Sequence, residues 1–120
     1  MVQLSIRIDF AADHRMGPGK IQLLEQIGAL GSIAAGGRAL GMSYRRAWEL
    51  IDELNTIFGS PVVISQAGGK KGGGAAVTPL GLTIISRYRA IERAAASAAE
   101  THVNALAAEV ASKARRQKRS

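Results

Sequence analysis

The feature that most limits how this chain can fold is the long C-terminal stretch after Gly81, which contains no further glycine or proline. Thr78 and Pro79 just before it are typical of a helix start, with threonine as the cap and proline in the first turn. A helix from there to about Lys113 would be roughly 50 Å long at a rise of 1.5 Å per residue. The 120 residues of the chain form one modest core. That core cannot cover so long a helix, and a partner chain is the economical way to bury it.

Apolar and small side chains recur along this predicted helix in steps of four and three, which is a heptad-like seam. We therefore expect a homodimer with these interface residues: Ile84, Tyr88, Ile91, Ala95, Ala98 and His102. The residues after Lys113 include several basic and no acidic side chains. The predicted organisation is one domain over residues 1–113, followed by a disordered basic tail over residues 114–120.

Three shorter helices are predicted before this stretch. Apolar residues at helical spacing indicate helices over residues 20–30, 33–40 and 43–58. Two short helices joined by a tight turn are typical of a helix-turn-helix unit, and Gly41 in the turn permits a positive φ. The third helix has an apolar stripe that we expect to face the core: Ala47, Leu50, Ile51, Leu54 and Phe58.

Serine and glycine residues mark the boundaries of these helices. Gly31 ends the first helix, and Ser32 and Ser43 can cap the second and the third. Gly36 and Gly37 weaken the second helix intrinsically, because glycine is a poor helix former. A glycine pair at that place is tolerable if another helix has to approach closely.

The remaining segments predict a small amount of β-structure. Residues 2–10 alternate apolar and polar side chains, which is typical of a strand with one buried face. Turn-forming residues predict a loop over 11–19. Two short strands over 62–64 and 75–77 would flank a loop, residues 66–74, that contains five glycines and two lysines. The predicted fold class is mainly α with a small β-sheet, a winged helix-turn-helix with a long C-terminal dimerisation helix.

Charge and composition narrow the function further. A net charge of +7 and a pI of about 10.6 favour a polyanionic partner, either nucleic acid or an anionic membrane surface. No signal peptide or apolar run of 18 residues is found, so we expect a cytoplasmic, nucleoid-associated protein without membrane contact. Cysteine is absent, which excludes disulfides and zinc–thiolate sites. His14 and His102 have no metal-ligand spacing, and we predict neither a metal site nor an enzyme.

The first turn of the third helix carries the candidate DNA contacts Ser43, Tyr44, Arg45 and Arg46. The second helix of a helix-turn-helix enters the major groove, where arginine can pair bidentately with guanine. Ser43 and the free amides of the first turn can accept a phosphate. The simpler alternative is that the two arginines are solvated charges and that Tyr44 packs near the turn. Trp48, on the flank of the helix, is interpreted as a structural residue.

The glycine-rich loop has three possible interpretations. It could be a flexible linker or a phosphate-binding loop of an enzyme, but Lys70 is followed by Lys71 and not by the Ser or Thr of a Walker motif. It could also be a wing whose lysines and bare backbone approach DNA. Its place directly after the third helix favours the wing. The predicted DNA contacts therefore include Lys70, Lys71 and Gly72, and also Ser32 at the start of the second helix.

These motifs together resemble the N-terminal DNA-binding domain of the molybdate-responsive ModE regulators and, more distantly, LysR-type winged helices. The resemblance covers about residues 20–92. It rests on Leu24-Glu25-Gln26-Ile27, Gly31-Ser32-Ile33, Gly41-Met42-Ser43-Tyr44-Arg45-Arg46-Ala47-Trp48, Glu53-Leu54-Asn55, Gly68-Gly69-Lys70-Lys71-Gly72-Gly73-Gly74-Ala75 and Thr78-Pro79-Leu80-Gly81.

The resemblance implies a homodimer held by the long C-terminal helices, with two recognition helices in successive major grooves of a pseudo-palindromic site on double-stranded DNA. Full-length members of the family sense molybdate through C-terminal oxyanion-binding modules. This sequence ends at Ser120 without such a module, so we expect no cofactor and no direct molybdate binding. The resulting hypothesis is a transcriptional regulator. The alternatives are an architectural DNA-binding protein of low sequence specificity and a winged-helix dimer that binds proteins.

Overall fold

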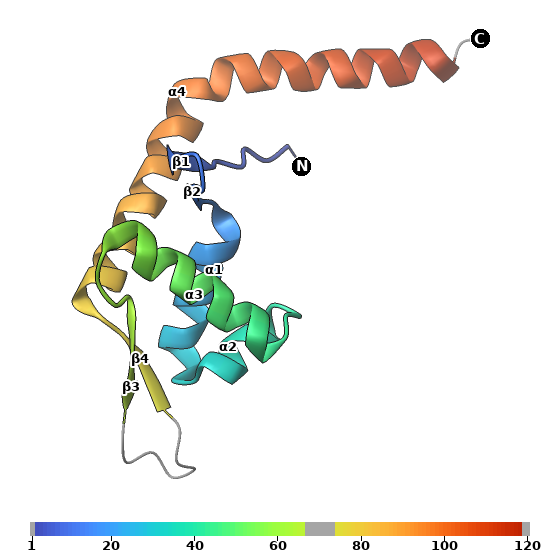
Figure 1. The fold of residues 1–120 in the computed structure, drawn as a ribbon. Coiled ribbons are helices and arrows are strands. Elements are labelled where there is room, and N and C mark those ends of the chain that lie inside the picture. Colours follow the sequence, from blue (N-terminus) through green and yellow to red (C-terminus); the bar gives the residue numbers. More distant parts are fainter. Residues whose placement is uncertain (1, 67–73, 119–120) are drawn as a thin grey trace.

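The computed structural model describes residues 2–66 and 74–118, and Figure 1 shows the winged helix-turn-helix architecture that the sequence predicts. The prediction of a mainly α protein with a small amount of β-structure is confirmed. The elements in chain order are β1 (Ile8–Ala11), β2 (His14–Met16), α1 (Pro18–Leu30), α2 (Ile33–Ala39), α3 (Tyr44–Phe58), β3 (Val63–Gln66), β4 (Gly74–Val77) and α4 (Pro79–Lys118). No helix in these two ranges is long and apolar enough to cross a membrane.

The predicted caps fix the short helices in place. The Ser32 hydroxyl accepts a hydrogen bond from the Ala35 amide at 3.1 Å and starts α2, and the Ser43 hydroxyl accepts one from the Arg46 amide at 3.0 Å and starts α3. Gly31 ends α1 with a φ of 70°, in the left-handed region that favours glycine. Gly41 in the turn before α3 has a φ of 72°, as the sequence predicts.

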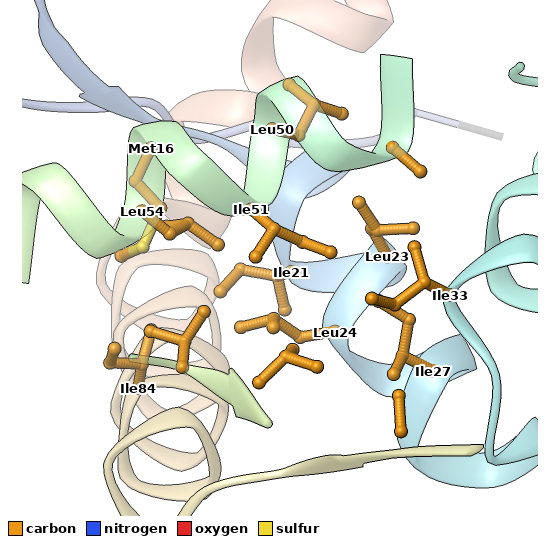
Figure 2. Packing of buried hydrophobic residues seen from close by; sticks show 14 of the residues in the cluster. Met16, Ile21, Leu23, Leu24, Ile27, Ile33, Leu50, Ile51, Leu54 and Ile84 are labelled. Atoms are coloured by element: carbon orange, nitrogen blue, oxygen red, sulfur yellow. The ribbon is translucent and has the colours of Figure 1, made fainter. Parts of the chain in front are cut away.

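The core lies between α1 and α3 and is closed on one side by α4 (Figures 1 and 2). Figure 2 shows apolar side chains of α1 and α3 pointing toward one another, with Ile84 of α4 at the edge of the cluster. Four side chains of α1 are buried: Ile21, Leu23, Leu24 and Ile27. The predicted stripe of α3 supplies four buried side chains, Ala47, Leu50, Ile51 and Leu54, whereas Phe58 is only half-buried.

The glycine pair of α2 allows two helices to approach it closely. A Cβ built on Gly36 would lie 2.8 Å from Cγ1 and 3.1 Å from the backbone nitrogen of Ile27 on α1. A Cβ on Gly37 would lie 3.2 Å from the Cβ of Ala47 on α3. The same two glycines that make α2 a weak helix former therefore let it pack closely against α1 and α3, as the sequence suggests.

The N-terminal strand differs from its prediction. Only the end of the predicted strand, β1, is extended and paired, and its partner β2 lies in the segment predicted as a loop. The apolar side chains of the segment 2–10 are not buried. Val2, Leu4 and Phe10 are exposed, and Ile8 is half-buried. The physical reason is that β1 pairs with only three residues of β2, and within the described residues the two strands form a small sheet of their own.

The second hairpin forms as predicted, with slightly different bounds. β3 pairs with β4 in antiparallel register from Val63 opposite Val77 to Gln66 opposite Gly74. The Ala75 amide donates a 2.9 Å hydrogen bond to the Gly31 carbonyl oxygen, which ties β4 to the end of α1. The predicted contact residues between the two strands, Lys70, Lys71 and Gly72, lie outside the described residues.

The first part of α4 lies along the domain, and its C-terminal half turns away and projects from it (Figure 1). The Tyr88 hydroxyl donates a 2.5 Å hydrogen bond to the Ile6 carbonyl oxygen, and the Arg89 guanidinium makes two hydrogen bonds to Glu25 of α1, at 2.6 and 3.1 Å. The helix ends at Lys118 and includes residues 114–118, for which the sequence predicts a disordered tail. The helix continues because no glycine or proline interrupts it.

We predict that Gly36→Ala lowers the free energy of unfolding by about 1–3 kcal/mol, as is usual when a group is forced into a filled core. The matched control is Gly19→Ala in α1, where nothing lies within 4 Å of an added Cβ. Because alanine is the better helix former, the control should be as stable as the wild type or slightly more stable. Denaturant unfolding followed by circular dichroism measures both. Equal stability of the two variants would contradict the close packing of α1 and α2.

Candidate nucleic-acid interface

The first turn of α3 presents its polar side chains to solvent. The Arg45 side chain is 90% exposed and that of Arg46 is 53% exposed. Tyr44 is also exposed. The opposite side of the same helix is buried in the core through Ala47 and Leu50. The helix therefore has the orientation that the sequence predicts, with its arginines free to approach a ligand outside the domain.

Both arginines share one acidic neighbour within α3. Arg45 Nε lies 3.6 Å from one carboxylate oxygen of Glu49, and Arg46 Nη1 lies 3.3 Å from the other. These ion pairs are exposed, and exposed pairs contribute little to stability because water screens them. The arginines can therefore leave Glu49 for a phosphate or a base at small cost.

Ser32 lies beside the first turn of α3, because both residues 32 and 44 line one pocket between α2, α3 and the wing strands. Ser32 is half-buried and its oxygen is used as the cap of α2. Ser43 is exposed and caps α3. The structure thus brings four of the five described candidates, Ser43 to Arg46, into one turn, with Ser32 close to it.

Sequence reasoning missed several basic residues near Arg46. Arg7, Arg15 and Lys20 line an open cleft of about 620 Å³ together with Arg46 and the N-terminal turn of α1. Lys20 Nζ donates a hydrogen bond to the Arg15 carbonyl oxygen and lies 3.4 Å from a carboxylate oxygen of Glu53. The three residues are scattered over segments predicted as a strand, a loop and a helix start, and no pattern in the sequence joins them.

The predicted dimer residues fall into two groups. Ile84 and Tyr88 are mostly buried in the core of their own domain, although both also line an apolar groove beside α4. Ile91, Ala98 and His102 are exposed, and Ala95 is half-buried. The two groups differ because one face of α4 first packs on its own domain and then continues beyond it, so the predicted dimer interface stays a prediction.

Two groups at the junction of α4 with the domain have shifted pKa values. Burial raises the pKa of the Tyr88 hydroxyl above its ordinary value, and the nearby Glu92 carboxylate raises it further. Hydrogen bonds to Glu25, and then to Glu92, hold the pKa of the Arg89 guanidinium above its ordinary value. Both groups lie where α4 packs on the rest of the domain. They are not at the first turn of α3.

Comparison with known proteins agrees with this geometry. The chain is 43% identical over 99 residues to the molybdenum-pterin-binding protein MopB of Rhodobacter capsulatus, which is 80% of this chain and 37% of MopB. It is 41% identical over 71 residues to the DNA-binding transcriptional dual regulator ModE of Escherichia coli K12, which is 59% of this chain and 27% of that protein. This chain carries a ModE-like domain.

The resemblance to ModE that the sequence motifs indicate is thus confirmed. The molybdenum transport protein ModE of Azotobacter vinelandii is a further relative, 41% identical over 73 residues, or 61% of this chain and 27% of that protein. No family model matches the chain. The matched part of this ModE-like chain spans only 27–37% of the length of these curated relatives.

We predict that Ser43→Ala lowers the free energy of unfolding of the ModE-like domain by about 1 kcal/mol, because the cap of α3 is lost. Ser43→Asp keeps an oxygen at the capping position and should be as stable as the wild type. Thermal unfolding by calorimetry distinguishes the two variants. If Ser43→Ala unfolds like the wild type, the 3.0 Å hydrogen bond to the Arg46 amide does not set the start of α3.

Proposed function

We propose that this chain is a homodimeric DNA-binding regulator of transcription that reads a pseudo-palindromic site. The recognition helix α3 would enter the major groove, and the glycine- and lysine-rich wing predicted over residues 68–74, next to β3 and β4, would contact the DNA beside it. The observation that carries the proposal is the first turn of α3, where Tyr44, Arg45 and Arg46 are all exposed on a helix whose other side is anchored in the core.

Charge supports nucleic acid as the partner. The chain has a net charge of +7, and additional cations, Arg7, Arg15 and Lys20, lie around the cleft next to Arg46. Phosphate contacts of such groups dominate affinity for DNA and make it steeply dependent on salt. The names of the relatives add support, because the Escherichia coli relative is a DNA-binding transcriptional regulator. A cytoplasmic location would follow from that role.

Exposed apolar residues on α4 support a homodimer. Beyond Ile84 and Tyr88, the same face of α4 continues with the exposed Ile91. After His102 it continues in steps of four residues with Leu106 and Val110, which are 69% and 71% exposed. An apolar groove of about 340 Å³ also lies between α4 and the first hairpin. A second copy that covers this stripe would remove it from water, which is favourable in proportion to the area buried.

A second candidate is an architectural protein that coats DNA with little sequence preference. The exposed cations at the C-terminal end of α4, Lys113, Arg115 and Arg116, favour it, since they need no base contacts to bind phosphate. Selection of bound duplexes from a pool of random sequence decides between the two candidates. We expect an enriched palindrome; a pool that stays random while binding occurs would support the architectural role. Absence of any complex at low salt would favour the third role, protein binding.

We predict that Arg45→Ala weakens binding to the selected duplex by about 1–3 kcal/mol and relaxes the base preference at one position of each half-site. The matched control is Arg93→Ala, which removes the same charge from an exposed position of α4. Fluorescence anisotropy of labelled DNA at fixed salt gives both affinities. If the two variants lose affinity equally and keep the same base preference, Arg45 acts only as a charge and does not read a base.

We predict that the double variant Leu106→Glu/Val110→Glu is monomeric at concentrations where the wild type is a dimer. Two exposed apolar side chains would be replaced by like charges that face one another in the dimer, so the dissociation constant should rise at least about 100-fold. Analytical ultracentrifugation measures it. The control is Ala108→Glu/Ala111→Glu, which places the same charges on the opposite face of α4. A dimer that persists in the first variant places the interface elsewhere.

A further inference from the structure

A pocket of about 290 Å³ lies between the recognition helix and the wing strands β3 and β4. Its wall is formed by two aromatic residues of α3, Tyr44 and Trp48, and by small residues of the wing strands and of α2: Ser32, Ala34, Ser65 and Gly74. A water molecule takes about 30 Å³ in the liquid, so the space suits a group of the size of a sugar ring with its phosphate. None of the residues that line it is acidic.

The two aromatic rings are arranged to offer one surface. Tyr44 and Trp48 are one helical turn apart and pack edge to face, with ring centroids 6.3 Å apart and planes at 80°. Trp48 is half-buried and rests with one side on the core, whereas Tyr44 is exposed. An exposed tyrosine braced by an anchored tryptophan offers apolar ring edges and a hydroxyl donor in a fixed place, which is the combination that recurs at binding surfaces.

The position of the pocket decides what can enter it. If α3 occupies the major groove and the wing lies at the adjacent minor groove, the strand that separates the two grooves must pass between α3 and the wing. The pocket is the space between these two elements. We propose that it binds one deoxyribose–phosphate unit of that strand, with the sugar against Trp48 and the phosphate bonded by the Tyr44 and Ser65 hydroxyls. This inference rests on the proposed function, which it refines.

The proposal assigns to Trp48 and Tyr44 a role that neither arginine supplies. Base contacts specify a sequence, whereas contacts to sugar and phosphate fix the register and angle of a protein on the duplex. A strand held between α3 and the wing would set the depth to which Arg45 enters the groove. Tyr44 and Trp48 would thus position the reading residues without reading a base themselves.

The chain contains a single tryptophan, so its fluorescence reports on this pocket alone. The experiment measures quenching of Trp48 by acrylamide in the full chain, with and without saturating amounts of the selected duplex. We expect the quenching constant to fall at least about twofold when the duplex binds. An unchanged quenching constant in a complex that anisotropy shows to be saturated would overturn the inference and leave the proposed function intact. Absence of any complex would overturn both.

A second measurement locates the phosphate. Single phosphates of the duplex are replaced in turn by neutral methylphosphonates, and the affinity of the wild type is compared with that of Tyr44→Phe, which removes only the hydroxyl. At one position in each half-site we expect the replacement to weaken the wild type about tenfold and Tyr44→Phe less than twofold. The other phosphates of the same duplex are the internal control. Equal losses for both proteins at every position would show that the Tyr44 hydroxyl bonds no phosphate.

Discussion

The burial of α1 is the constraint on which the other elements depend. Its side chains Ile21, Leu23, Leu24 and Ile27 are buried, and the helix contacts α2, α3, α4, β2 and β4. Burial of a side chain of this size stabilises a fold by about 1.5–3 kcal/mol, so α1 contributes much of the hydrophobic free energy of a small domain. Because α2 packs on α1 through Gly36, and β4 bonds to Gly31 at its end, the helix-turn-helix and the wing strands are held by the same element. This arrangement fixes the distance between the first turn of α3 and the wing strands, so the pocket between them follows from the packing of the fold.

The long helix α4 uses one face for two purposes. Near its start, Ile84 and Tyr88 complete the core, and the hydrogen bonds of Arg89 to Glu25 fix the helix on α1. Farther along, the same face has no further part of its own domain to cover, and Leu106 and Val110 are exposed. The two parts belong to one continuous helix, which bends where it leaves the domain (Figure 1). If a second copy of the chain covered the exposed part of α4, the α3 helices of the two copies would be held at a set separation. A DNA site with two half-sites requires such a separation.

The helix-turn-helix could be predicted from the sequence because its signals are local. Helical spacing of apolar residues, two serine caps and the glycines that follow α1 and α2 each act within one or two turns, and α1 to α3 form close to the predicted bounds. The packing of α4 is harder to predict, because a repeat in steps of four and three does not tell whether Ile84 and Tyr88 pack on their own chain or on another. The alternation of residues 2–10 predicts a strand, but the length of β1 is set by its partner β2. The strand β2 could not be predicted because it lies in a segment rich in turn-forming residues. Trp48 has an apolar ring on the flank of a helix, and only the structure shows that one side of it faces a pocket.

The shared carboxylate of Glu49 explains how the arginines can be ordered and still available. In the free protein it holds Arg45 and Arg46 near the surface of α3 at 3.6 and 3.3 Å, which limits the number of orientations that the two long side chains sample. The pairs are solvent-exposed, so breaking them costs little, whereas a bidentate hydrogen bond to a base or phosphate is charge-assisted and stronger. If α3 enters the major groove as proposed, both arginines can therefore exchange Glu49 for acceptors on the duplex without a large loss of free energy.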